Sequence, residues 1–365
     1  MTYFCKNITI METDILTNIK IEKIKTSKLP KNGVNNLKFG SSFTDHMFIC
    51  TYKNGKWQDA KITPYQPLSL DPSTRVFHYG QAIFEGMKAY KDTNNDVFLF
   101  RPDKNQERLN KSAVRMQMPE LPKELFFDGL TTLLQIEKDW IPTAEGNSLY
   151  IRPFMIASGH GIYAAPSDEY IFMIICSPSG KYYAKDVNVV IAEHYSRAAN
   201  GGVGAAKAAG NYGAQFYPTQ QAIKKGFNQI IWTDSTHTYL EEAGTMNVFF
   251  RINDTLLTAP TSERILDGVT RKSIITLAKD MGIFVEERRV SVEELTEAAK
   301  NGSLKEIFGA GTAAVITRIT KFSYKNEEFT LPEIENGYAD MFKKYLTDIQ
   351  YNRSADKFGW RFKVS

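Results

Sequence analysis

Apolar and polar positions along the chain change repeatedly between the two-residue period of strands and the 3.6-residue period of helices. Residues 46–62 alternate around Asn54-Gly55, a pair suited to a type I′ turn, and predict a β-hairpin. Helical spacing covers 103–118 and 123–141, and the second segment carries apolar residues on one face. Two runs rich in Ile, Phe and Tyr, 148–158 and 169–179, predict buried strands.

The second half of the chain repeats this mixture after a stretch of Pro, Gly and charged residues at 178–186. The predicted strands are 187–192, 227–233, 245–254 and 255–259, and the predicted helices are 213–226 and 268–282. A further helix is expected to begin at Ser291, because Glu294 three residues later completes a capping-box signature.

The chain has 365 residues, and single cores tend to divide beyond about 250–300 residues. The pattern therefore predicts an α+β fold of two mixed domains. Residues 1–180 form the smaller domain, of which the first 35 or so are a polar lead-in. Residues 186–365 form the larger domain, and 178–186 link the two.

Composition narrows the possible partners. A net charge of +4, with lysines interleaved among acids, favours neither nucleic acid nor a polybasic membrane contact. No apolar run reaches the ~18–20 residues of a membrane span, and the start of the chain lacks a signal-peptide core. Cys5, Cys50 and Cys176 are too far apart for a CxxC metal site or a disulfide framework, which predicts a cytoplasmic protein without a metal. Cys50 and Cys176 lie in strand-like apolar runs and are expected to be inert core residues.

One lysine stands out in "GGVGAAKAAGNY", residues 201–212. Lys207 carries the only formal charge between Arg197 and Lys224. An apolar setting disfavours the ammonium and prepares the amine for Schiff-base chemistry, although a surface lysine in a glycine loop is the alternative. A phosphate-binding Walker A loop is excluded, because alanines flank the lysine where Gly and Ser or Thr are needed.

A Schiff-base lysine suggests pyridoxal phosphate as cofactor, and each polar group of that cofactor requires a particular kind of protein partner. The pyridine nitrogen needs an acid, the phosphate needs a helix start and an arginine, and the phenolic oxygen needs a donor. The chain offers Glu241 and Glu242 beside a strand, "GVTR" at a helix start, and Tyr212 five residues beyond the lysine.

Seven motifs follow one another in a fixed order over about residues 39–320. They are "HYGQAIFEGMKAY", "FRPDKNQERL", "LYIRPFMI", "GGVGAAKAAGNY", "LEEAGTMNVFF", "LDGVTRKSI" and "FGAGTAAVITRI". Together they resemble the branched-chain amino acid aminotransferases of the fold-type IV pyridoxal-phosphate family. The resemblance implies an active site between the two domains, a homodimer, and ping-pong transfer of the amino group of L-leucine, L-isoleucine or L-valine to 2-oxoglutarate.

The resemblance also implies a role for each matching residue around the cofactor. Lys207 is the Schiff-base lysine and proton carrier, and Tyr212 bonds the phenolic oxygen. Glu242 pairs with the ring nitrogen; since adjacent strand residues face opposite sides, Glu241 is expected to be a solvated neighbour. The remaining cofactor residues implied are Arg108, Arg197, Thr245, Val269, Thr270 and Thr312.

The substrate residues are implied in the same way. The expected aromatic walls are Tyr79, Phe84, Tyr150 and Tyr182, with Tyr79 reaching across from the partner subunit. Ordinary core packing is the alternative for each aromatic. The N–H groups of Thr312 and Ala313 are expected to bind the α-carboxylate, and Arg152 the second carboxylate of glutamate.

Other interpretations remain open. A D-amino acid aminotransferase or an aminodeoxychorismate lyase would share the fold and the lysine. "GAGTAA" at 309–314 could also be a dinucleotide-binding loop of an oxidoreductase. Some animal members carry a redox CxxC at the positions of Ala314 and Thr317, so no thiol switch is expected there.

Overall fold

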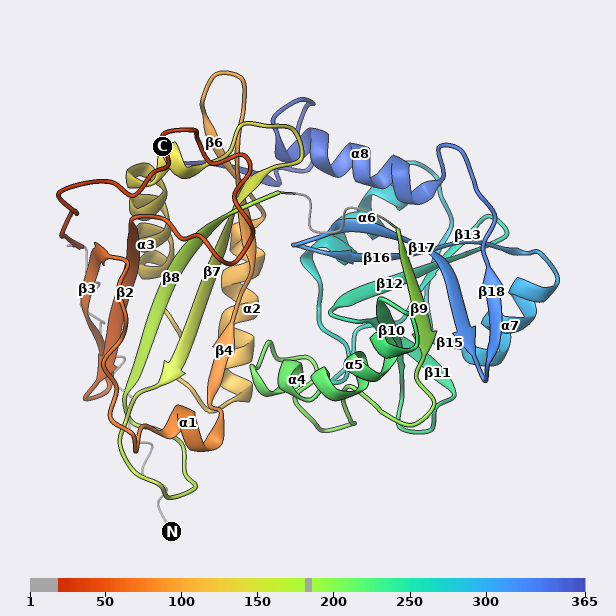
Figure 1. Ribbon diagram of the computed structural model, residues 1–365, viewed down its shortest axis with the longest axis horizontal. Helices are drawn as coiled ribbons and strands as arrows, with labels where there is room; N and C mark the ends of the chain where they lie inside the picture. Colours follow the sequence, from red (N-terminus) through yellow and green to blue (C-terminus); the bar gives the residue numbers. More distant parts are fainter. Residues whose placement is uncertain (1–18, 181–185, 365) are drawn as a thin grey trace, which may run out of the picture.

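The computed structural model describes residues 19–180 and 186–364. Within them the strands form two sheets that lie side by side in Figure 1. The first sheet has nine strands in the order β1-β3-β2-β8-β7-β5-β6-β19, with β4 joined to β7. Its strands are β1 (Lys20–Ile21), β2 (His46–Lys53), β3 (Lys56–Pro64), β4 (Ala82–Phe84), β5 (Met87–Lys91), β6 (Val97–Phe100), β7 (Ser148–Ala157), β8 (Tyr170–Ser179) and β19 (Arg361–Val364).

The second sheet closes on itself. Strands β12, β16, β17, β9, β10 and β11 follow one another, and β11 then pairs with β12 again. Strands β13, β14, β15 and β18 extend this ring. The bounds of these strands are β9 (Val187–Ile191), β10 (Gln229–Thr233), β11 (Tyr239–Ala243), β12 (Met246–Ile252), β13 (Thr255–Thr258), β14 (Val285–Glu287), β15 (Val290–Ser291), β16 (Leu304–Gly311), β17 (Val315–Tyr324) and β18 (Glu327–Thr330).

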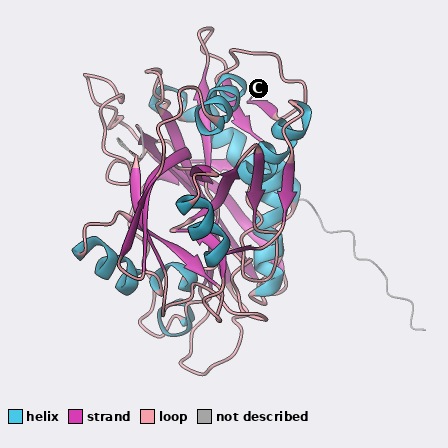
Figure 2. Ribbon diagram, turned by 90° about the vertical axis from the view of Figure 1, so that its right-hand side faces the viewer, coloured by secondary structure: helices cyan, strands magenta, loops and turns pink. Residues whose placement is uncertain are grey.

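Helices pack against the sheets (Figures 1 and 2). Helix α3 packs its apolar face on the first sheet, and α2 lies between the two halves. Helices α6 and α8 share a core with β12 and β16, whereas α7 joins the core of the ring. The helices are α1 (Arg75–Tyr79), α2 (Pro102–Arg115), α3 (Lys123–Ile136), α4 (Gly210–Gly213), α5 (Phe216–Lys224), α6 (Val269–Asp280), α7 (Val292–Lys300) and α8 (Tyr338–Gln350), with a 3₁₀ turn at Lys138–Trp140.

The predicted hairpin is confirmed. Strands β2 and β3 pair antiparallel with Lys53 opposite Lys56. Asn54 and Gly55 take φ values of 54° and 77°, and positive φ at both central residues is what a type I′ turn requires. The helix and strand predictions for 103–118, 123–141, 148–158 and 169–179 are confirmed as well, with shorter bounds.

The capping box at Ser291 is half formed. Its Oγ accepts a hydrogen bond from the Glu294 N–H at 2.9 Å, as an N-cap should. The Glu294 carboxylate does not complete the box, because it pairs with Arg288 at 2.6 Å instead. A nearby arginine thus outcompetes the backbone N–H for the carboxylate.

The end of the chain departs from the predicted domain division. Strand β19 pairs antiparallel with β6, so residues assigned to the larger domain complete the first sheet. The Arg101 N–H also donates to the Trp360 carbonyl at 2.8 Å. The prediction was wrong here because periodicity identifies a strand but not its partner. The linker prediction lies partly outside the described residues, since 181–185 are not among them.

The two described cysteines behave as expected of core residues. Cys50 and Cys176 are free and buried, and burial raises the pKa of both thiols. Cys5 lies outside the described residues. Among residues 19–180 and 186–364, no helix combines the length and apolarity that crossing a membrane would need.

Candidate active site

A cavity of about 610 Å³ lies between the two halves of the molecule. The first half contributes β4, β7 and α2, and the second contributes the lysine loop, β11, the start of α6 and the turn after β16. Most of the candidate residues line it: Phe84, Arg108, Tyr150, Arg152, Lys207, Tyr212, Glu242, Thr245, Val269, Thr270, Thr312 and Ala313.

Strand β7 forms one wall of the cavity. Successive side chains of a strand point to opposite faces, so Tyr150, Arg152, Phe154 and Ile156 share the face that lines the cavity. The alternate residues, such as Ile151, pack into the first core. The "LYIRPFMI" motif therefore supplies core and site from the two faces of one strand.

Arg152 is half-buried in this wall and held by aromatic groups. Its Nη2 donates to the Tyr150 hydroxyl at 3.0 Å, and its guanidinium lies 4.6 Å from the centre of the Phe84 ring. The Nε of Arg152 is buried and has no hydrogen-bond partner among the described residues. A buried donor without a partner is costly, which indicates that this group has an acceptor when the cavity is filled.

The glycine-rich loop carries Lys207 across to the first half of the molecule. The Ala209 N–H donates to the Ala82 carbonyl at 3.0 Å, and the Phe84 N–H donates to the Lys207 carbonyl at 3.0 Å. The Lys207 N–H donates to Ser112 Oγ on α2 at 2.9 Å. These three bonds attach the loop to β4 and α2.

The Lys207 side chain points into the cavity. Its Nζ donates to the Tyr212 hydroxyl at 2.8 Å and lies 4.7 Å from the centre of the Phe84 ring. Among the described residues that line the cavity, Lys207 has the only amine. The loop therefore presents one amine, with a phenol beside it, to whatever the cavity binds.

Glu242 is the buried acid of the site. Its Oε1 accepts from the Leu266 N–H at 2.9 Å and from Asn247 Nδ2 at 3.3 Å, and its Oε2 lies 3.0 Å from Arg197 Nε. Burial raises the pKa of the Glu242 carboxyl, and the charges of Arg197 and Lys207 offset part of that rise. An acid with a raised pKa is suited to sharing a proton with a ring nitrogen.

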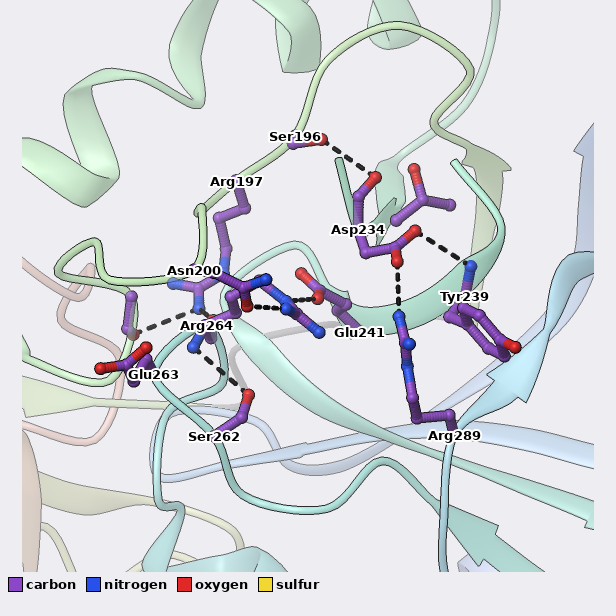
Figure 3. A network of polar contacts seen from close by, with 12 residues as sticks. Ser196, Arg197, Asn200, Asp234, Tyr239, Glu241, Ser262, Glu263, Arg264 and Arg289 are labelled. Atoms are coloured by element: carbon purple, nitrogen blue, oxygen red, sulfur yellow. Dashed lines mark hydrogen bonds and ion pairs between the residues drawn. The ribbon is translucent and has the colours of Figure 1, made fainter. Parts of the chain in front are cut away.

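Glu241, the neighbouring acid, is not solvated as expected. It is buried and pairs with Arg264, which also donates to Asn200, as Figure 3 shows. The prediction that the two glutamates face opposite sides of β11 agrees with the cavity lining, which includes Glu242 and not Glu241. It was wrong about solvent, because a second arginine lies behind the strand. The Arg264 carbonyl accepts from Arg197, which ties this pair to Glu242.

Arg108 enters the cavity from α2 and is oriented by a second buried acid. Its Nε and Nη2 donate to the two oxygens of Glu85 at 2.7 and 2.8 Å, and its Nη1 donates to the Asp267 carbonyl at 3.1 Å. Burial alone would raise the pKa of Glu85, but the charge and hydrogen bonds of Arg108, together with the Lys207 charge and the Asn105 hydrogen bond, outweigh it and hold the pKa below its ordinary value. This bidentate pair fixes the guanidinium plane.

The start of α6 faces the cavity without a side chain in the way. Gly268 is the N-cap residue, and no side chain caps the helix there among the described residues. A Cβ at Gly268 would lie 1.9 Å from Asn247 Oδ1, so only glycine fits. The N–H groups of the first turn, at Val269 and Thr270, are therefore available to an anion.

The chain matches known proteins over most of its length. Residues 82–322 match the family described as amino-transferase class IV. Branched-chain-amino-acid aminotransferase 2 of Bacillus subtilis (strain 168) is 45% identical over 353 residues, which cover 95% of this chain and 97% of that protein. The branched-chain-amino-acid aminotransferase of Mycolicibacterium smegmatis is 40% identical over 360 residues, 96% of each chain.

The chain belongs to the class IV aminotransferases, in the branched-chain family.

Solved structures of this family share the fold. The Escherichia coli branched-chain amino acid aminotransferase superposes with a TM-score of 0.74 at 24% identity, covering 88% of this chain and 99% of that one. The Thermobaculum terrenum enzyme, solved in its PLP-form, has a TM-score of 0.73 at 21% identity and covers 88% of this chain and 98% of that one.

Two candidate residues of this aminotransferase do not line the cavity, and a third lies outside the described residues. Arg197 lies behind Glu242 rather than in the wall. Tyr79 is 42% exposed on α1, and its hydroxyl donates to the Ile162 carbonyl. Tyr182 lies outside the described residues.

Sequence reasoning missed two residues that organise the site. Glu85 orients Arg108, and Asn247 bonds Glu242 and the Leu266 carbonyl. Both stand inside quoted motifs, "FEGMK" and "GTMN", as polar residues within apolar strand-like runs. A buried polar side chain needs a hydrogen-bonding partner, so the presence of a polar residue inside an apolar run could have pointed to both residues.

The dinucleotide interpretation of "GAGTAA" is wrong for this aminotransferase. Strands β16 and β17 pair antiparallel, with Gly311 opposite Val315, so the motif ends one strand and turns into the next. A dinucleotide loop needs a strand followed by a helix, whose first N–H groups bind the pyrophosphate. Thr312 and Ala313 instead present the turn to the cavity.

The variant G86A tests whether substrate binding depends on the position of the Tyr150 hydroxyl. A Cβ at Gly86 would lie 2.2 Å from that oxygen, so G86A should displace the tyrosine and break its bond to Arg152. We expect the KM for glutamate, whose second carboxylate Arg152 is expected to bind, to rise about tenfold, the equivalent of one hydrogen bond. The measurement is steady-state kinetics, with G213A as control because a Cβ at Gly213 meets open space. An unchanged KM in a folded G86A protein would contradict this placement of Tyr150.

Proposed function

We propose that this enzyme transfers the amino group of L-leucine, L-isoleucine or L-valine to 2-oxoglutarate, with pyridoxal 5'-phosphate as cofactor. The observation that carries the proposal is the position of Lys207. It brings the cavity's one amine among the described residues to the Tyr212 hydroxyl, within electrostatic reach of the buried Glu242. The family relatives bear the matching names.

The donor set of the cavity fits pyridoxal phosphate at each end. When bound, this group supplies an aldehyde that links to amines and a ring that accepts electron density from the substrate's α-carbon. Arg108 and the open first turn of α6 suit a phosphate, and the Thr312 hydroxyl lies in the same wall. Glu242 would hold the ring nitrogen, and Tyr212 would donate to the phenolic oxygen.

Lys207 has two tasks in this proposal. Its amine would hold the bound cofactor through the aldehyde, and as a free amine it would move the proton of the substrate's α-carbon. The loop bonds to β4 and α2 hold the lysine backbone in place while the side chain moves. Thr245, exposed in the turn between β11 and β12, borders the same space.

The cavity wall formed by β4 and β7 suits the branched apolar side chain of one substrate and the charged side chain of the other. Phe84, Tyr150, Phe154 and Ile156 supply rigid apolar surface. Arg152, whose Nε has no partner in the described part of the chain, would receive the second carboxylate of 2-oxoglutarate or glutamate. The N–H groups of the Thr312–Ala313 turn would bind the α-carboxylate that both substrates share.

We propose that the enzyme is a homodimer in the cytoplasm. Tyr79 stands on the surface beside an exposed apolar group, formed with Phe77, Ile162 and Tyr163, of which Phe77 is 60% and Ile162 71% exposed. Exposed apolar clusters mark contacts, and from this position Tyr79 would reach a neighbour's cavity rather than its own. The free thiols of Cys50 and Cys176 suit a reducing compartment.

The first test is the visible absorption of the protein loaded with pyridoxal phosphate. Leucine should bleach the cofactor's visible band and 2-oxoglutarate should restore it, because each half-reaction changes the cofactor. The K207A variant should lose the band's response and at least about 10⁴-fold of turnover, since it lacks both the link and the proton carrier. K224A, which removes an exposed lysine of α5, should behave as the wild type.

Two results would contradict the proposal. Bleaching by D-amino acids alone would replace the substrate with that of a D-amino acid aminotransferase. Transamination by a folded K207A protein would remove the lysine from the reaction.

Arg152 provides a second test, of dual substrate recognition. R152M should raise the KM for 2-oxoglutarate about 10- to 100-fold, because a charge-assisted hydrogen bond is lost, and change the KM for leucine much less. R353M, at a surface ion pair with Glu145, serves as control. Equal effects on both KM values would place Arg152 outside the second-carboxylate site.

Substitutions in the exposed apolar group of Phe77, Tyr79, Ile162 and Tyr163 test whether it forms the dimer interface. The wild type should sediment as a dimer, and the double variant F77D/I162D should sediment as a monomer, because buried carboxylates without partners disfavour the contact. F284D, at a residue 65% exposed between α6 and β14, is the matched control. A variant that remains dimeric would move the interface elsewhere.

A further inference from the structure

A second cavity, of about 400 Å³, lies behind the turn after β16. It shares Ala313 and Ala314 with the first cavity, so the turn forms a thin wall between them. Lys88 lines the second cavity and not the first. It has no role in the chemistry described above.

Lys88 reaches this turn from the first sheet. It lies on β5 directly opposite Tyr150 of β7, and paired residues on antiparallel strands share a face of the sheet. Both side chains therefore point toward the second half of the molecule. The Lys88 Nζ donates to the Ala313 carbonyl at 2.8 Å, across 225 positions in the sequence.

The setting of Lys88 is unfavourable for a lysine. The residue as a whole is only 6% exposed. Burial, and then the nearby Lys343 ammonium, lower its pKa to about 8. An apolar residue would avoid this cost, so the contact with the turn is what the lysine provides that an apolar residue would not.

The backbone conformation of the turn explains why such a contact is useful. Val315, which ends it, has a φ of 59°, a left-handed conformation that a β-branched residue rarely adopts. The Ala313 carbonyl shares a peptide plane with the Ala314 N–H, so anchoring it fixes the end of the turn that carries the Thr312 and Ala313 N–H groups. Free rotation there would turn those donors away from the cavity.

We propose that Lys88 is a positioning residue, which holds the Thr312–Ala314 turn so that its N–H groups meet the substrate's α-carboxylate. The inference rests on the proposed function, because it assumes that this turn binds the carboxylate. Since both substrates share that carboxylate, removing Lys88 affects them equally. This distinguishes Lys88 from Arg152, which serves one substrate.

The groups around Lys88 determine how its effect depends on pH. Tyr90 of β5 and Tyr351 after α8 have raised pKa values and stay neutral, and Lys343 of α8 supplies a repelling ammonium. Asp186 and Asp340, which also line the cavity, are both paired with Arg318, and Gln350 carries no charge. Lys88 is therefore the group expected to titrate near pH 8. Below that pH it donates as an ammonium, and above it as a weaker neutral amine, so the KM for both substrates should rise above about pH 8.

The experiment compares K88M with K88R in the cofactor-loaded enzyme. The probe is 4-methylvaleric acid, a leucine-sized carboxylate without an amine, whose binding needs no turnover. K88M should weaken its Kd about 10- to 100-fold and raise the KM for leucine and for 2-oxoglutarate by the same factor. The kcat should change by less than about twofold, and K88R should restore most of the affinity. K343M should keep wild-type affinity and move the pH dependence upward, because it removes a repelling charge.

Two outcomes would overturn the inference, and a third would overturn the proposed function instead. A K88M protein that binds 4-methylvaleric acid as tightly as the wild type, with its cofactor band intact, does not need Lys88 to hold the turn. A loss of the cofactor band in both K88M and K88R would make the residue structural rather than positioning. A wild type that binds the probe but transfers no amino group would refute the proposed function, whereas the comparison of probe affinities would still test Lys88.

Discussion

The bridge between strand β4 and the lysine loop is the interaction on which the site depends. The Phe84 and Ala209 backbone bonds join a strand of the first sheet to a loop of the second half, and Ser112 adds a third bond from α2. Because backbone groups make the bridge, a loop of small residues can approach closely. Without it Lys207 would stand on a surface loop, as its sequence alone allows.

Buried charges are arranged around this bridge in arginine–glutamate pairs. Arg108 pairs with Glu85, Arg197 with Glu242, and Arg264 with Glu241. Buried ion pairs often contribute little to stability, because desolvation offsets their attraction. Their arrangement here orients one guanidinium and one carboxylate into the cavity, and those are the charges that an anionic, nitrogen-containing cofactor requires.

The two halves contribute different things to one reaction space. The first sheet provides rigid side chains on one face of β7, whose other face is its own core. The second half provides backbone donors at the start of α6 and in the turn after β16, together with the amine. Aromatic walls select shape, and backbone donors bind charge without adding bulk. Under the proposed function, this division would let one cavity accept both an apolar and a charged side chain.

Local chemistry was predictable from the sequence by itself. The Asn54-Gly55 turn, the main helices and the isolated Lys207 follow from short-range rules of periodicity, turn conformation and charge, and ordered motifs identified the family. Tertiary structure alone decided the pairings between distant segments. It placed β19 in the first sheet, buried Glu241 against Arg264, and brought Glu85 to Arg108 and Lys88 to Ala313. The physical reason is that the sequence around a charged residue does not indicate which distant residue will pair with it. Burial makes a partner necessary, and only the packing of the two halves determines which group becomes that partner.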